Sequence, residues 1–331
     1  MIYGVIFLYL SFFLTYLIFI IMNGSINERV NEILTANGLD FTIEKLPLVA
    51  KQKIVSVGAD GGLVDDINLV NSPYYGLLNS KTGEIINTVK SGYTVSQNAD
   101  IVELVLRGVE PFGEQLKVQK AGSLNGGKRV FIQLAIEGTS KVGNDIIKRY
   151  VTIIDYNDGS TGLSVGIGDL TMSCQNQFFH FYKSGQSKMR HTASLDQKIR
   201  EIPNLISLAL SQSMNQIDIY NRMVGVGISD RNVHEMVKLH TGVSKLSSVA
   251  DLSDASTRVT NAMETLYEMI RVEMAQKGRN VWGLHSGVTR WTTHEKSAPR
   301  RENGRIESAM LGTNSRTNEK SFDFAKELIL V

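Results

Sequence analysis

Two groups of basic residues interleaved with aromatic residues are the clearest chemical feature of this sequence. The first follows the run Phe178-Phe179-His180-Phe181-Tyr182-Lys183 and contains Lys188, Arg190 and His191. The second lies near the C-terminus and contains Trp282, Arg290, Trp291, Lys296, Arg300, Arg301 and Arg305. Proteins that bind single-stranded nucleic acid combine cations along the phosphates with flat rings on which bases stack. The alternative for each group is a buried aromatic core beside a solvated charged surface.

The distribution of charge along the chain supports the nucleic-acid hypothesis. The 331 residues include 35 Lys+Arg and 33 Asp+Glu, and this net charge of +2 by itself indicates no nucleic-acid or membrane partner. Residues 1–175, however, carry 14 basic and 17 acidic side chains, whereas residues 176–331 carry 21 and 16. The small total therefore hides a basic C-terminal half, which contains both aromatic groups.

A lone cysteine gives a second, catalytic hypothesis. Cys174 is the only cysteine of the chain, and His180 and His191 follow it, so a cysteine–histidine nucleophile is conceivable. A lone cysteine that ends a strand is usually a small buried hydrophobe instead. One cysteine also excludes a disulfide framework and any multi-cysteine metal site. An enzyme that uses Cys174, Asp158 and His191 is therefore kept only as an alternative.

Other catalytic and metal-binding patterns are weak. G-x-G-x-x-G and H-E-x-x-H do not occur, and Gly126-Gly127-Lys128 lacks the Ser or Thr of a P-loop, which favours a hairpin turn. Asp155 and Asp158 could touch one metal ion, but Asn157-Asp158-Gly159 is itself typical of a turn. We therefore expect no catalytic residue, no metal and no cofactor.

The first 21 residues form a separate apolar segment. Eighteen of them are apolar, and the first charged side chain of the chain is Glu28. At 1.5 Å per residue such a helix would reach about 30 Å, enough to cross a bilayer. Met22 opens a second plausible start, so the segment is either a membrane anchor or an upstream extension. A signal peptide fits less well, because no basic residue precedes the apolar run.

The remaining residues, 22–331, predict a single α+β domain that is sheet-rich over 40–175 and helical over 194–331. Period-two alternation over 130–137, and turns that separate apolar runs, predict an antiparallel meander of four or five strands within 115–174. Residues 74–78 are expected to pair with 84–89. Helical periodicity and glycine stops predict helices over 26–37, 98–108, 196–223, 230–240, 253–277 and 281–294. The expected turn and cap residues are Gly126, Gly127, Asp158, Gly159 and Asn176.

Six short motifs, in order along the chain, carry a resemblance to a known family. They are Tyr93-x4-Asn98, Ala121-Gly122-Ser123-Leu124-x-Gly126-Gly127-x-Arg129-Val130-Phe131, Tyr150 through Asp158-Gly159-Ser160, Cys174-Gln175-Asn176, Arg190-His191-Thr192, and Trp282-Gly283 to His294. Through them, residues 70–328 resemble the phage/plasmid-like family, a domain of unknown function of bacteriophages, prophages and plasmids. Gln177, where Thr is common, and the apolar segment before Met22 depart from the family pattern. The resemblance implies an accessory protein of mobile-element DNA metabolism and no assigned catalytic residue.

We therefore expect a non-enzymatic protein that binds single-stranded nucleic acid, DNA rather than RNA, and that could anneal it, through the basic C-terminal half. A homo-oligomer is compatible with this function. The candidate contact residues are Arg129, Lys188, Arg190, His191, Trp282, Arg290, Trp291, Lys296, Arg300, Arg301 and Arg305. The alternative from another class is an anti-defence factor that binds a host protein. The expected location is the host bacterial cytoplasm, with membrane anchoring only if residues 1–21 are translated.

Overall fold

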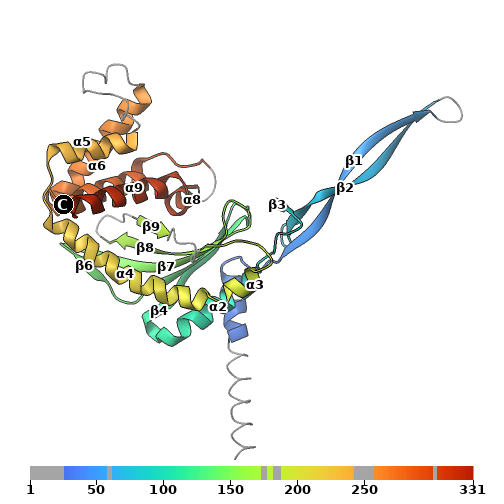
Figure 1. Cartoon of the computed structure of the whole chain (residues 1–331), viewed down its shortest axis with the longest axis horizontal. Helices are drawn as coiled ribbons and strands as arrows, with labels where there is room; N and C mark the ends of the chain where they lie inside the picture. The colour runs from blue at the N-terminus through green and yellow to red at the C-terminus, as the bar shows by residue number, and fades with distance from the viewer. Residues whose placement is uncertain are drawn as a thin grey trace, which may run out of the picture.

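Period-two alternation in the first half of the chain and helical periodicity in the second half produce two different kinds of structure (Figure 1). The computed structural model describes residues 26–57, 62–172, 177–181, 188–241, 256–300 and 304–330. The predicted α+β class is confirmed. The apolar segment 1–21, Cys174, Asn176 and Arg301 lie outside the described residues. In the part of the chain that is described, no helix combines the length and hydrophobicity needed to cross a membrane.

A three-stranded antiparallel sheet forms first, in the order β1–β2–β3. Its strands are β1 (Ile43–Val57), β2 (Leu63–Asn79) and β3 (Ile85–Lys90). The predicted pairing of 74–78 with 84–89 is confirmed, since β2 and β3 pair in this region. β1 and β2 form one hairpin of 15 and 17 residues, and β2 extends well beyond the predicted segment 74–78. A bulge between Pro47 and Val49 accommodates the proline, which cannot donate to the ladder.

A seven-stranded antiparallel sheet follows and confirms the predicted meander. Its strands are β4 (Leu116–Leu124), β5 (Arg129–Ile136), β6 (Ser140–Val142), β7 (Asp145–Tyr156), β8 (Leu163–Thr171), β9 (Gln177–Phe181) and β10 (Lys188–Met189). The main order is β10–β8–β7–β5–β4, with β6 paired to β7 and β9 paired to β8. Between β4 and β5, Asn125 and Gly126 have φ values of 55° and 68°, a conformation that Asn and Gly tolerate best.

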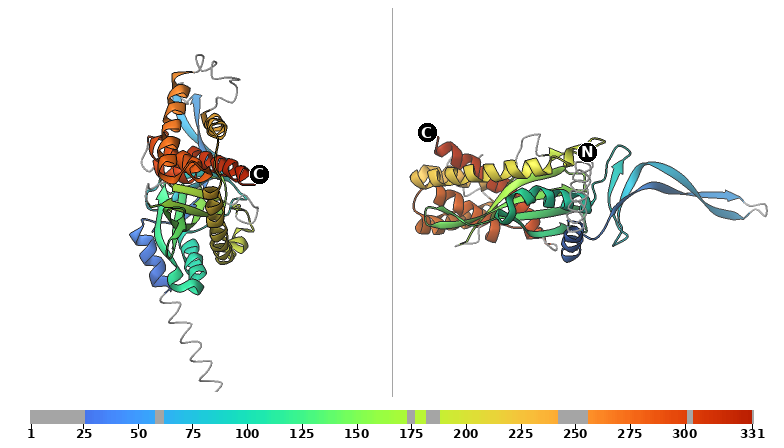
Figure 2. Two further views of the ribbon diagram at one scale, coloured as in Figure 1. Left: turned by 90° about the vertical axis from the view of Figure 1, so that its left-hand side faces the viewer. Right: turned by 90° about the horizontal axis from the view of Figure 1, so that it is seen from below.

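Helices cover both faces of this second sheet (Figures 1 and 2). α2 (Asn98–Val109) and α4 (Ile202–Gly225) pack on one face, where Val130 and Ile132 join them in one buried cluster. Phe131, the residue between these two, belongs to a separate cluster with Ile154 and Met310. Because successive side chains of a strand point to opposite faces, this division is the one that the period-two pattern predicts.

The helical half departs from the predicted bounds in three places. α3 (Leu195–Ile199) and α4 replace the single helix predicted over 196–223, because Pro203 lacks the N–H that a continuous helix needs. α7 (Val281–Arg290) passes into a π-helical turn, Trp291–Glu295. α8 (Gly304–Met310) and α9 (Thr313–Leu328) are not predicted, because their sequence is too polar for a clear apolar stripe. α5 (Asp230–Thr241) and α6 (Thr257–Lys277) lie where they are expected.

Candidate functional site

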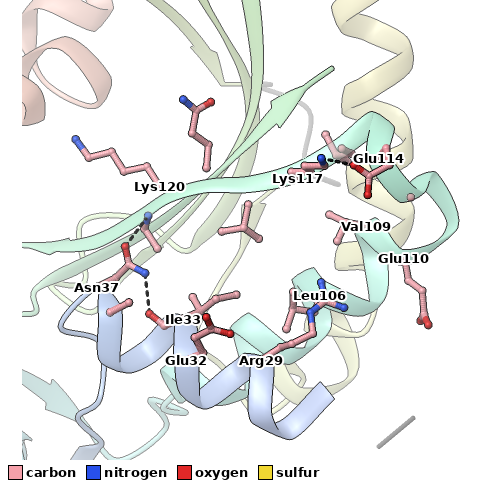
Figure 3. A pocket seen from close by; sticks show the side chains of 16 residues that line it. Arg29, Glu32, Ile33, Asn37, Leu106, Val109, Glu110, Glu114, Lys117 and Lys120 are labelled. Atoms are coloured by element: carbon pink, nitrogen blue, oxygen red, sulfur yellow. Dashed lines mark hydrogen bonds and ion pairs between the residues drawn. The ribbon is translucent and has the colours of Figure 1, made fainter. Parts of the chain in front are cut away.

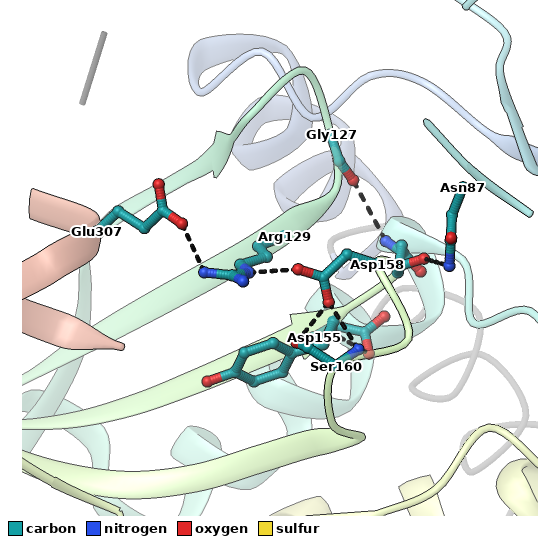
Figure 4. Close-up of polar contacts among 9 residues, drawn as sticks. Asn87, Gly127, Arg129, Asp155, Asp158, Ser160 and Glu307 are labelled. Carbon is teal, nitrogen blue, oxygen red and sulfur yellow. Dashed lines mark hydrogen bonds and ion pairs between the residues drawn. The ribbon is translucent and has the colours of Figure 1, made fainter. Parts of the chain in front are cut away.

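The turns at one end of the second sheet bring several motif residues together (Figure 4). We refer to residues 124–129 and 156–162 as the turn cluster. The backbone N–H of Asp158 donates to the carbonyl of Lys128 at 3.1 Å, which joins the two turns. Asn157 Nδ2 donates to the Gly127 carbonyl at 3.4 Å, and Asn87 Nδ2 of β3 donates to the Asn157 carbonyl at 2.8 Å. The first sheet is thus tied to the second at this point.

Glycine makes the close approach of these turns possible. Gly127 has a φ of 95°, and a Cβ atom there would lie 2.9 Å from Asn79 Nδ2 and 3.0 Å from the Phe41 ring. Gly126 and Gly159 have φ values of 68° and 72°, which L side chains rarely adopt. Each of these three glycines therefore lies in a turn that a larger residue would strain.

Arg129 joins the turn cluster to α8 (Figure 4). Its Nε donates to Asp158 Oδ2 and its Nη1 to Glu307 Oε1, both at 2.6 Å. The guanidinium also lies over the Tyr156 ring, 5.6 Å from the ring centre. Burial raises the pKa of Asp158, but hydrogen bonds from Ser160 and Arg129 outweigh burial and hold that pKa below its usual value. The sequence predicts Arg129 as a contact for nucleic acid, but in the structure it forms ion pairs with two carboxylates of the protein itself.

A buried ion pair lies next to the turn cluster. His191 Nε2 lies 2.9 Å from Asp155 Oδ1, and His191 Nδ1 lies 3.1 Å from the carbonyl oxygen of Thr94. A carboxylate and a carbonyl only accept hydrogen bonds, so both neighbours favour the protonated form of the ring. Burial lowers the pKa of His191, but Asp155 and the Thr94 carbonyl outweigh burial and raise it above its usual value. Tyr93 stacks on the ring at 4.7 Å, and Ser96 Oγ donates to Asp155 Oδ2 at 2.5 Å.

This geometry does not favour catalysis by His191. His191 is buried, and its two ring nitrogens face Asp155 and the Thr94 carbonyl, so neither nitrogen is directed at a position that a substrate could take. The sequence also contains a G-x-S-x-G pattern at 162–166, in which Ser164 is buried in β8 and donates to the Gly162 carbonyl at 3.1 Å. A strand interior is not the strand–turn–helix elbow that this pattern needs for a nucleophile. Within the described residues, no three His, Cys, Asp or Glu side chains gather closely enough to hold a metal ion.

Two cavities open at the turn cluster, and Ser160 and Thr161 lie in the walls of both. The first measures about 440 Å³ and includes Arg190 in its wall; the second measures about 320 Å³ and includes Arg316 of α9. Both arginines are exposed, and neither has an ion-pair partner among the residues that the structure describes. Exposed guanidinium groups beside hydroxyl groups suit phosphate oxygens, which accept several hydrogen bonds at once. Arg316 is not among the predicted residues, because no helix is predicted over 313–328.

Trp282 and Arg290 belong to a buried polar network. Trp282 is 5 % exposed, and its Nε1 donates to Asp145 Oδ2 at 2.7 Å. The same carboxylate pairs with Lys277, whose Nζ also lies 3.3 Å from Glu273 Oε2. Arg290 Nη1 donates to the other oxygen of Glu273 at 3.0 Å. Trp282 therefore holds α7 against β7, and Arg290 holds α7 against α6, although the sequence predicts both as contacts for nucleic acid.

Trp291 and Lys296 are also engaged within the protein. Trp291 is 4 % exposed, and Lys296 Nζ lies 4.9 Å from the centre of its ring. Lys296 donates to Thr317 Oγ1 at 2.5 Å. Burial and, to a smaller extent, the charge of Lys320 lower the pKa of Lys296 to about 8. Neither tryptophan can therefore serve as an exposed ring for base stacking.

The other predicted contact residues lie near the surface. Arg305 Nη1 donates to the carbonyls of Thr293 and His294 at 2.8 and 3.3 Å, at the end of the π-helical turn. Arg300 is exposed. Lys188 lies in β10, two residues before Arg190, and its side chain lies outside the part of the chain that the structure describes. Of the predicted contacts, Arg190 and Arg300 are thus exposed and have no described partner.

A third cavity, of about 570 Å³, lies away from the turn cluster (Figure 3). The helix over residues 26–36, the 3₁₀ turn Glu110–Gln115 and the edge strand β4 form its walls. Lysines and a bulge between Val118 and Lys120 protect this edge against the addition of another strand. Its walls carry charges of both signs, including Arg29 and Glu32, so we assign it no ligand.

Comparison with known proteins places most of this architecture in one family. Residues 85–321 match DUF932, a domain of unknown function. No curated protein and no solved structure matches the chain. The matched segment includes the second sheet, the turn cluster and its two cavities, and it covers more than half of the chain. The chain therefore belongs to the DUF932 family of domains of unknown function.

Proposed function

We propose that the protein is a non-enzymatic binder of single-stranded DNA that serves the DNA metabolism of a phage or plasmid. The observation that carries this proposal is the pair of exposed arginines, Arg190 and Arg316, at the two cavities of the turn cluster. Both lie in the half of the chain that carries 21 basic and 16 acidic side chains. The mobile-element setting rests on the resemblance that the sequence motifs carry, and some of these motifs contribute residues to the turn cluster.

The proposed mode of binding differs from the one that the sequence suggests. Trp282 and Trp291 are buried, so they do not stack on bases. Arginine contacts with phosphates hold a strand without reading its sequence. We therefore expect weak sequence preference and an affinity that falls steeply with salt concentration.

The test is a fluorescence anisotropy titration of the full chain with a labelled single strand of about 30 nucleotides at low salt. Arg190→Ala/Arg316→Ala should weaken binding by about tenfold or more, because two charge-assisted contacts are lost. Each phosphate contact on a single strand contributes about 0.7 to the slope of log K against log salt. The double variant should therefore show a slope shallower by about 1.4.

The matched control is Arg231→Ala/Arg271→Ala. These two arginines are also exposed, but each pairs with a glutamate on its own helix, Glu235 on α5 and Glu268 on α6. The control should keep the affinity and the salt slope of the unmodified chain. Equal losses in the two double variants would exclude the turn cluster as the site. No binding at low salt would overturn the function, and tighter binding of an RNA strand of the same sequence would overturn the choice of DNA.

A further inference from the structure

The outer part of the β1–β2 hairpin projects from the body of the protein as a two-stranded ribbon (Figures 1 and 2). We refer to residues 49–57 and 63–71 as the arm. Nine registered pairs connect its two strands, from Val49–Asn71 to Val57–Leu63, so the ribbon is about 30 Å long. A two-stranded ribbon without a covering layer is only marginally stable in water.

One face of the arm is open to solvent and carries most of the arm's exposed apolar side chains. Residues that lie opposite each other on two paired strands point to the same face of the ribbon. Every second pair, from Val49–Asn71 to Val57–Leu63, therefore lies on one face. The exposed apolar side chains of this surface are Val49 (49 %), Val55 (54 %), Leu63 (77 %), Ile67 (61 %) and Leu69 (60 %). Lys51, Lys53 and Asp65 belong to the same face, so it combines exposed apolar side chains with charges of both signs. Exposed apolar groups flanked by polar ones in this way mark a place where another molecule binds.

Both edges of the arm are also open. β3 pairs with β2 only over Tyr74–Leu78, and within the described residues no strand pairs with the outer edge of β1 or with the arm part of β2. An open edge presents unpaired backbone N–H and C=O groups, which are completed by another strand.

The two edges carry opposite charges. In the arm, β1 contributes Lys51 and Lys53 and no acidic residue, whereas β2 contributes Asp65 and Asp66 and no basic residue. Two β1 edges side by side would place lysines against lysines, and two β2 edges would place aspartates against aspartates. Only β1 beside β2 joins opposite charges, as Lys53 and Asp65 already do within one arm at 2.6 Å.

We propose that the arm pairs with the arm of a second copy of this chain, with the β1 edge of one copy beside the β2 edge of the next. Neighbouring arms then point the same way, and their strands continue as one antiparallel sheet. The contact is head-to-tail, so it repeats and closes into a ring or continues as a filament. The occupant is a copy of the chain and not nucleic acid, because the arm carries equal numbers of basic and acidic residues and offers phosphates no net attraction.

Sedimentation velocity of the full chain without nucleic acid tests this proposal independently of the DNA-binding function. The unmodified chain should form oligomers that grow with concentration. Lys51→Glu/Lys53→Glu gives both edges negative charge, and Asp65→Lys/Asp66→Lys gives both edges positive charge. Each variant alone should associate at least about tenfold more weakly, because like charges then meet at the contact.

Two further samples separate lost pairing from a damaged hairpin. An equimolar mixture of the two variants should associate again, because every contact between unlike copies joins opposite charges. The chain with all four substitutions has its charges exchanged and should associate like the unmodified protein. Lys117→Glu/Lys120→Glu on β4 makes the same charge change away from the arm and should leave association unchanged.

Three results would overturn the proposal. They are a monomeric unmodified chain at every concentration, charge variants that associate as tightly as the unmodified chain, and an equimolar mixture that stays dissociated. Association driven by another part of the chain, or by a surface common to all the variants, would give the second result.

Discussion

The arm and the second sheet are both antiparallel, but they place their apolar residues in opposite environments. In β7, the eight residues from Arg149 to Tyr156 are all buried between helical layers. In the arm, Val55 and Leu63 are more than half exposed. The strands of the two regions have a similar share of apolar residues. The difference in burial therefore comes from the helices, which cover the second sheet and do not cover the arm. Strand-forming sequence in this protein therefore stabilises the fold in one place and provides an open surface in the other.

Outside the arm, the stability of the protein should fall most when a buried charge loses its partner. In Asp145→Ala, Lys277 loses its closest carboxylate and the Trp282 indole loses its acceptor. Breaking a buried ion pair by removing one member costs about 3–5 kcal/mol, and we expect a loss of this size in the free energy of unfolding. Urea denaturation followed by tryptophan fluorescence measures it. Asp230→Ala, which removes an exposed pair with Arg279, should cost no more than about 1 kcal/mol.

A second prediction concerns the contact between α6 and α7. A Cβ atom at Gly287 would lie 2.4 Å from Ile270 Cα and 2.9 Å from its backbone nitrogen, so the helices would have to move apart. Gly287→Ala should lower the free energy of unfolding by about 1–3 kcal/mol, as overpacking does in other cores. Gly225→Ala, where nothing lies within 4 Å of the added atom, should be neutral or slightly stabilising. Similar melting temperatures for the two variants would contradict the close packing of these two helices.

A third prediction uses two buried histidines of the body. Burial and, to a lesser extent, His240 lower the pKa of His285 to about 3, whereas the pKa of His191 is raised. With an unfolded pKa near 6.5, His285 makes stability fall as pH decreases, by about 1 kcal/mol at pH 5.5. His191 has the opposite sign, because its contribution is complete below pH 6.5 and is lost as pH rises through its folded pKa. NMR titration of the ring protons should resolve these two values, and a shared pKa near 6.5 would contradict both assignments.

Local patterns predict the elements of this fold better than they predict its site. Alternation in 130–137 and the glycine-containing turns depend on neighbouring residues, so the meander can be predicted from them. The sequence of α9 is too polar to show a clear apolar stripe, so the helix is not predicted and Arg316 is not recognised as a candidate contact. The burial of Trp282 depends on Asp145, 137 residues away, and no local pattern contains that contact. Likewise, the arm looks like two ordinary strands until the layers that leave it uncovered are known.

The smallest expected effect on folding comes from the arm itself and gives the sharpest test of the comparison. Leu63 in β2 is 77 % exposed, whereas Leu134 in β5 is fully buried. Leu134→Ala should lower the free energy of unfolding by about 2–5 kcal/mol, because it leaves a cavity in the core. Leu63→Ala should change it by less than about 0.5 kcal/mol, because the same methyl groups leave a solvated surface. Urea denaturation at low protein concentration measures both values. A large loss in Leu63→Ala would mean that the arm packs against the body, and the open face on which self-association depends would then not exist.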